Sequence, residues 1–226
     1  MLFDLRSRGR RTTVRVVYLG LAILLGGGLV LFGVGTGSGN GGLLNAFGGG
    51  GGGGSAQKQV ISQQEQAALR EVRTNPNSAT GWGDLLQARW IAAGQGSNYD
   101  TSTGTFTAAG KKELQGAATA WQRYIALVKT PDPSLAILAA KTYAALGDYA
   151  GAASAWDHET LANPDAPKGY ECLALTAYAA SQTRKGQLAE NKALSLLPKN
   201  QQLQVKTALD SARSSPSTAK SAAAQC

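Results

Sequence analysis

The spacing of three prolines constrains this chain more than any other feature. Pro131, Pro164 and Pro198 recur with a period of about 34 residues. Proline ends a helix because it lacks the amide hydrogen and disfavours helix in the residue before it. The intervening residues are rich in alanine, and this period is typical of a helical hairpin repeated along a chain. The pattern therefore predicts an all-α fold built from antiparallel helix pairs.

The segment 134–164 carries the repeat pattern most completely. Tyr143 ends the packed face of a first helix, and Gly147 supplies the permissive backbone that stops it. Small Ala152 allows a second helix to approach closely, and Trp156 fills the space between the two. The matching positions are Tyr143, Gly147, Tyr149, Ala152, Trp156 and Pro164.

With these residues at these offsets, the chain resembles the tetratricopeptide repeat proteins over residues 57–213. The resemblance implies a short right-handed stack of helical hairpins. The third hairpin departs from the pattern where Ser181 replaces the turn glycine and Glu190 replaces the large aromatic. We expect a last helix over 201–213 to cap the stack and residues 214–226 to form a disordered tail.

An insertion near residues 95–108 splits the first hairpin. It offers side-chain oxygens at Asn98, Asp100 and the residues that follow, but the spacing of a calcium-binding loop fails because Thr103 occupies its glycine position. We therefore interpret the insertion as a lengthened hairpin loop in which Thr107 caps the next helix. Its role stays open.

The first 56 residues predict a membrane anchor. Residues 1–15 are basic, 16–34 are free of charge and span about 28 Å as a helix, and 35–56 form a glycine-rich flexible linker. Positive residues favour the cytoplasmic side, so we expect the N-terminus inside and the rest outside the cell membrane. The alternative is a cleaved signal peptide, although the small-residue site at 54–56 lies late for one.

Charge and composition disfavour a nucleic-acid partner and an enzyme. The net charge is +8, but five arginines and one aspartate lie before residue 16, and the later cations are dispersed. His158 is the only histidine, so no catalytic triad and no metal site are expected. The glycines at 48–54 lack the lysine and flanking elements of a phosphate loop. We expect no cofactor.

Two cysteines are too few for a disulfide scaffold. Cys172 falls where a helix would bury it as a small apolar residue, and Cys226 ends a polar tail. We favour a buried thiol and a frayed end. A disulfide between the two in an oxidising compartment is the alternative.

The resemblance implies that the first helices line a concave groove for a peptide or protein partner. The groove positions in this sequence would be Gln87, Trp90, Lys141, Lys168, Glu171 and Tyr178. With the anchor, they favour a membrane-anchored protein–protein interaction module that assists envelope assembly or protein translocation. The alternative is a structural membrane scaffold that self-associates and has no client.

Overall fold

The computed structural model describes residues 54–226. The predicted basic segment 1–15, the span 16–34 and nearly all of the linker 35–56 lie outside the described residues, but Gly54, Ser55 and Ala56 already belong to the first described helix. The elements are α3 (Gly54–Thr74), α4 (Ala79–Ala93), a 3-10 turn (Gly96–Asn98), β1 (Tyr99–Asp100), β2 (Thr105–Phe106), α5 (Ala108–Leu127), α6 (Pro133–Leu146), α7 (Tyr149–Ala162), α8 (Pro167–Ala179), α9 (Thr183–Leu196), α10 (Lys199–Ser214) and α11 (Pro216–Ala223). The predicted all-α fold is confirmed for this part of the chain.

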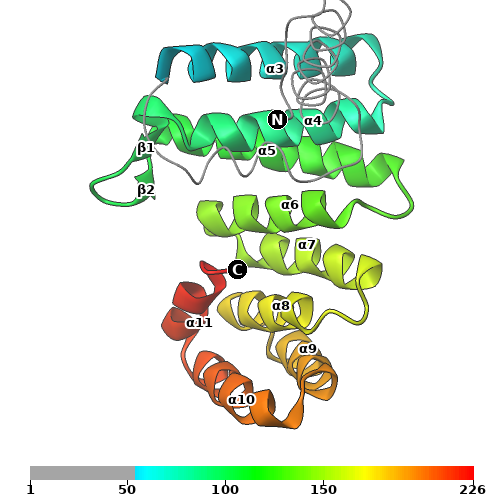
Figure 1. Cartoon of the computed structure of the whole chain (residues 1–226), viewed down its shortest axis with the longest axis vertical. Helices are drawn as coiled ribbons and strands as arrows, with labels where there is room; N and C mark the ends of the chain where they lie inside the picture. The colour runs from blue at the N-terminus through cyan, green and yellow to red at the C-terminus, as the bar shows by residue number, and fades with distance from the viewer. Residues whose placement is uncertain (1–53) are drawn as a thin grey trace, which may run out of the picture. The chain divides into compact units, whose positions relative to one another are not determined.

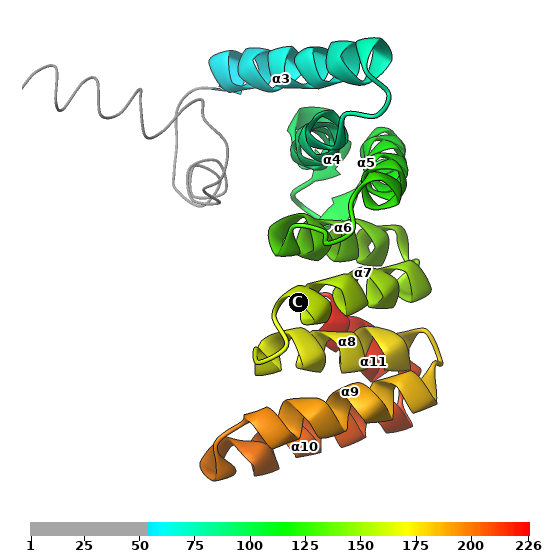
Figure 2. The same ribbon diagram turned by 90° about the vertical axis from the view of Figure 1, so that its right-hand side faces the viewer.

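The helices follow one another in a stack. Figures 1 and 2 show α4 to α9 packed side by side in chain order, with α3 at one end and α10 at the other. First helices also meet directly, since a Cβ on Gly83 of α4 would lie 2.9 Å from Cδ1 of Leu135 on α6. The last helix, α11, turns back and packs on α8. Within the described residues, no helix is both long and apolar enough to cross a bilayer.

Prolines and caps fix where the helices begin. Pro133 opens α6 and Pro167 opens α8, in the first turn, where a missing amide removes no helical hydrogen bond. Asp148 caps α7 by accepting a hydrogen bond from the Gly151 amide at 2.8 Å. These start signals, Pro133, Pro167 and Asp148, lie in the sequence itself.

The turns that end α6 and α8 have the same geometry. Gly147 lies in the left-handed region with φ +79°, and Ser181, at the same place one repeat later, has φ 61°. In both turns the next amide bonds a carbonyl five residues back: Asp148 to Tyr143, and Gln182 to Ala177. Replacing the turn glycine with serine therefore changes the strain at this position but not the shape of the turn.

The core consists mainly of alanines, and a few large side chains fill the remaining space between the helices. Trp121 and Trp156 are 2% and 4% exposed. Around them, many alanines from different helices are buried, and their small side chains let the helices pack close together. At the place of Trp156 in the next hairpin stands Glu190, which is 3% exposed. That hairpin therefore has a buried acid where the one before it has an indole ring.

The C-terminal segment is not the disordered tail that its polar composition predicts. Ser215 caps α11 by accepting from the Thr218 amide, and Ala219 and Ala223 are buried. Cys226 forms a disulfide with Cys172 of α8, with the two Cα atoms 5.7 Å apart. Our preference for a free buried thiol was wrong, because composition gives no sign that α11 folds back onto α8.

Candidate functional site

The predicted groove residues begin on α4, where Gln87 and Trp90 lie one helical turn apart and are both half-buried. Lys141 is exposed on α6, which is the first helix of the next hairpin and also contacts α4. Together with Lys168 on α8, these residues define what we name the first-helix face: Gln87, Trp90, Lys141 and Lys168. Each successive first helix therefore presents at least one solvent-accessible polar or aromatic side chain.

Of the three predicted residues on α8, Lys168 and Glu171 are partners of each other. Lys168 Nζ lies 3.6 Å from Glu171 Oε2, and the lysine side chain is 69% exposed while the glutamate is 18% exposed. An ion pair this exposed contributes little to stability, about 0.5 kcal/mol. Lys168 can therefore exchange Glu171 for a carboxylate on another molecule at small cost.

The insertion supplies an aromatic surface beside Trp90. Its two short strands pair antiparallel, with Tyr99 opposite Phe106. The Phe106 ring lies 6.2 Å from that of Trp90 and 5.1 Å, edge to face, from that of Tyr99. We name these three half-buried side chains the aromatic patch. The sequence contained a weak signal for it, because two aromatics flank a short polar turn in this insertion.

Hydrogen bonds hold the insertion in place. Thr107, the predicted cap, accepts from the Gly110 amide, and its hydroxyl donates to the carbonyl of Ser97 at 3.0 Å. The Asn98 side chain donates to the carbonyl of Ala92 at 2.9 Å. The prediction of Thr107 as the cap of the following helix is confirmed.

The Asp100 carboxylate in the insertion accepts hydrogen bonds from residues of its own turn. Asp100 accepts from the Ser102 amide at 2.9 Å and from the Ser102 hydroxyl at 2.6 Å. These bonds, with a weaker one from Thr103, hold the pKa of the Asp100 carboxyl below its ordinary value. No cluster of metal-ligating side chains occurs between residues 54 and 226.

Next to the first-helix face, α3, α4 and α5 share a charged cluster. Arg89 Nε lies 3.5 Å from Glu65 Oε1. Burial raises the pKa of Glu65, and the nearby charge of Glu113 raises it further, while Arg89 acts in the opposite direction. The guanidinium lies so close to Gly116 that any side chain there would displace it. This cluster joins the three helices.

Tyr178 does not belong to the first-helix face. It is 4% exposed, and its hydroxyl donates to Glu190 Oε2 at 2.5 Å. Burial and the neighbouring carboxylate of Glu190 raise its pKa well above the ordinary value. The prediction placed Tyr178 in the groove from its repeat position alone, whereas the buried Glu190 draws the phenol toward α9 and α10.

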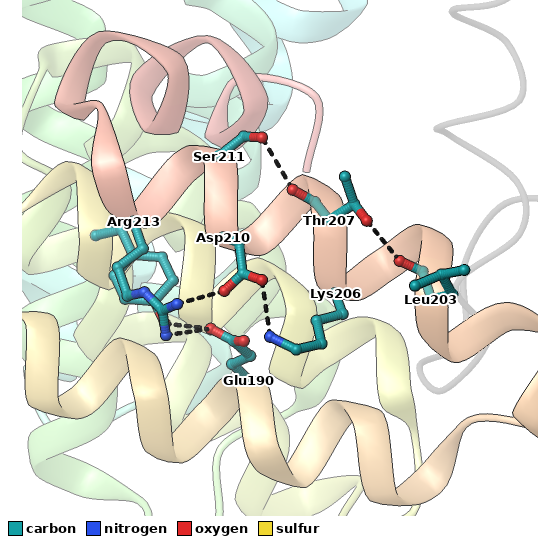
Figure 3. Close-up of polar contacts among 8 residues, drawn as sticks. Glu190, Leu203, Lys206, Thr207, Asp210, Ser211 and Arg213 are labelled. Carbon is teal, nitrogen blue, oxygen red and sulfur yellow. Dashed lines mark hydrogen bonds and ion pairs between the residues drawn. The ribbon is translucent and has the colours of Figure 1, made fainter.

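Around Glu190 the charges form a chain that reaches α10 (Figure 3). Arg213 lies 3.7 Å from Glu190 and also contacts Asp210, which accepts from Lys206 at 2.7 Å. These bonds lower the pKa of Asp210, chiefly through Lys206. A buried acid thus replaces a tryptophan because it fastens the last long helix to the stack.

Comparison with family models, with curated proteins and with solved structures finds no match to this chain. The site combines an aromatic patch at α4 with exposed cations on α6 and α8.

Proposed function

We propose that residues 57–213 form a tetratricopeptide-like repeat domain. Supporting this, α6 and α8 begin with proline at the same repeat spacing, and the turns after them share one hydrogen-bond pattern. Buried threonines also recur, with Thr142 and Thr176 each donating to a carbonyl one turn back in its helix at 2.8 Å. The domain is a right-handed stack of hairpins whose first helices bind a partner.

The partner is a peptide or protein segment that lies along the first-helix face. The observation that carries this proposal is the exposed pair of cations, Lys141 and Lys168, on helices that follow the aromatic patch in the stack. A complementary segment offers carboxylates to the lysines and an apolar or aromatic side chain to Trp90. Partners of this kind bind through charge-assisted hydrogen bonds and ring contacts.

Site-specific photo-crosslinking in cells that make the full-length chain tests the proposal. A photoreactive residue replaces Lys141 or, in the matched control, Ser154, which is exposed on the second helix α7. We expect a discrete adduct from position 141 and none from 154, and we expect Trp90→Ala to reduce the adduct. Equal adducts from both positions, or none from 141, would overturn the proposed binding face.

We further propose that the domain is tethered outside the cell membrane by residues 16–34, where it assists envelope assembly or protein translocation. The apolar run and the arginines before it support this. The native cysteines are joined, so a new cysteine in place of Lys141 gives a single reactive thiol. Labelling by a membrane-impermeant maleimide in intact cells is expected, and labelling only after lysis would place the domain inside.

Self-association is the second candidate, favoured by leucines exposed on the second helices. Leu161 on α7 is 77% exposed and Leu188 on α9 is 65% exposed. An ion pair between Asp157 and Lys185 joins the two helices about one turn before each leucine. Sedimentation of the full-length protein in detergent distinguishes the two candidates. If the protein is a self-associating scaffold, a Leu161→Gln, Leu188→Gln variant dimerises more weakly than the wild type. If the wild type is a strict monomer, it is not such a scaffold.

A further inference from the structure

The C-terminal segment covers the part of α8 on which a partner would lie. Lys168, Cys172, Leu175 and Ala179 follow one another at helical spacing, so they share one face of α8. Cys172 is fully buried, and the sulfur that contacts its own belongs to Cys226. The end of the segment therefore lies on this face of α8, one helical turn after Lys168, whose own side chain stays 69% exposed.

Apart from the disulfide, the contacts of this segment are small. α11 runs only from Pro216 to Ala223, and the side chains it buries fully are those of two alanines. Its one long side chain with a specific partner is Lys220, whose Nζ lies 5.7 Å from the centre of the Tyr149 ring on α7. A helix of this length is unstable in water by itself. The covalent bond is thus the dominant tie between the segment and α8.

We infer that residues 215–226, which we name the plug, cover part of α8 reversibly. The Cys172–Cys226 disulfide holds the plug on α8 in a latched state, and reduction of the disulfide releases it. The plug regulates the same first-helix face, so this inference rests on the proposed function. In the latched state it covers the surface around Cys172 and leaves Lys168 and the α4 and α6 end of the face free. In the open state the partner also gains access to the surface of α8 that follows Lys168, around Cys172 and Ala179.

A dithiol reductant performs the opening step. Its thiolate attacks Sγ of Cys226, the half-exposed partner, and a mixed disulfide forms while Cys172 leaves as a thiolate and takes up a proton. The second thiol of the reductant then attacks the mixed disulfide and releases Cys226. Two electrons pass to the protein disulfide, which becomes two thiols, and the dithiol becomes a cyclic disulfide.

Hydrogen exchange on the full-length protein tests the plug. We compare the oxidised protein, the protein treated with dithiothreitol, and a Cys226→Ser variant. Amide exchange within 218–226 should be about tenfold faster or more in the last two samples, because α11 leaves α8. Exchange in α4, α5 and α6 should not change, and this region reports that the domain remains folded.

A second readout is the thiol of Cys172. In the Cys226→Ser variant it should react with iodoacetamide under native conditions, whereas a thiol still covered by α11 would react only after unfolding. If exchange over 218–226 is unchanged and Cys172 stays unreactive, the segment is a fixed part of the fold and the inference is wrong.

The link to binding is measured separately with a photoreactive residue at position 175, a half-buried position between Cys172 and Ala179 on this face. Its adduct should rise about tenfold on reduction, as expected when the competent state was mostly blocked. The adduct from position 141 serves as the reference. An unchanged adduct at 175, with a normal one at 141, overturns the plug but keeps the proposed function. If 141 gives no adduct in either state, the proposed function fails, and exchange alone decides whether the segment is released.

Discussion

At the scale of single residues, the clearest departure from the repeat pattern is Ser181. Among the described residues, it is the one non-glycine residue with a positive φ. L-residues in this left-handed region clash between Cβ and the backbone, at a cost of about 1 kcal/mol. The turn nevertheless keeps the hydrogen bonds of the Gly147 turn, so this strain is stored in the fold.

We predict that Ser181→Gly stabilises the protein by up to about 1 kcal/mol, because glycine removes the strain at this φ. Urea unfolding followed by circular dichroism measures the change. The reverse substitution in the preceding hairpin, Gly147→Ser, is the matched control and should destabilise by a similar amount. No gain in Ser181→Gly would mean that another interaction holds this turn.

The raised pKa of Tyr178 predicts that the folded protein loses stability at high pH. Its pKa is raised in the folded protein, so above about pH 10 the unfolded chain releases the phenolic proton while the folded chain keeps it. The contribution is complete below the unfolded pKa and is lost as the pH rises toward the folded one. Chemical unfolding at pH 8 and pH 11 should show a smaller fall in the free energy of unfolding for Tyr178→Phe than for the wild type. An equal fall in both would assign it to other groups, such as Tyr143, whose pKa burial also raises.

At the scale of elements, one close backbone approach and one ion pair decide how the insertion and α10 attach to the stack. The insertion lies on α5 where Gly110 has no side chain, and a Cβ there would lie 2.1 Å from the carbonyl oxygen of Asn98. At the other end, α10 attaches through Arg213 and the buried Glu190. Neither contact follows from helix periodicity.

We predict that Gly110→Ala destabilises the protein by about 1–3 kcal/mol, because the obstacle is backbone rather than the end of a flexible side chain. Trp90 fluorescence should shift as the aromatic patch loosens, and thermal unfolding measures the stability. Lys111→Ala, at an exposed position in the same turn, should leave both unchanged. A tolerated Gly110→Ala would show that the insertion can move away freely.

We predict that Glu190→Gln weakens the attachment of α10, with a loss of about 1–3 kcal/mol, because Arg213 and Tyr178 lose a charged acceptor. Arg213 is 36% exposed and solvent takes over part of its role, so Arg213→Gln should cost less. Hydrogen exchange in α10 and urea unfolding measure the two effects. If both variants lose the same stability, the Tyr178–Glu190 bond has little weight of its own.

At the scale of the whole described domain, the disulfide links α8 to the end of the chain across a sequence separation of 54 residues. Closing a loop of that length restricts the unfolded chain and stabilises the fold by at most about 4 kcal/mol. If α11 leaves α8 after reduction, part of this stabilisation is lost in that local step. The loss then does not appear in the free energy of global unfolding. The bond therefore acts on the C-terminal half more than on α3 to α5.

We predict that reduction lowers the free energy of unfolding by less than this limit and makes the C-terminal half unfold first. Urea unfolding with and without dithiothreitol, followed by hydrogen exchange in α9 and in α4, separates the two regions. Cys226→Ser without reductant should match the reduced wild type. Equal effects on α4 and α9 would mean that the domain unfolds as one unit in both states.

Between residues 57 and 213, the sequence by itself determined the helices of this protein and their order. Helix boundaries depend on local chemistry, such as Pro133, Pro167 and the Thr107 cap, and burial depends on the periodicity of alanine and tryptophan. Gly147 and Ser181 could be matched as one turn position because the repeat spacing is carried in the sequence.

Only the tertiary structure decided the contacts between residues far apart in the chain. It buried Tyr178 against Glu190, placed Phe106 beside Trp90, and joined Cys226 to Cys172. Each of these pairs links elements through space, and no local propensity or period encodes which helix a short segment such as α11 will pack on. The packing of α11 on α8 follows from which helix faces the stack leaves uncovered, and those faces exist only after the helices have assembled.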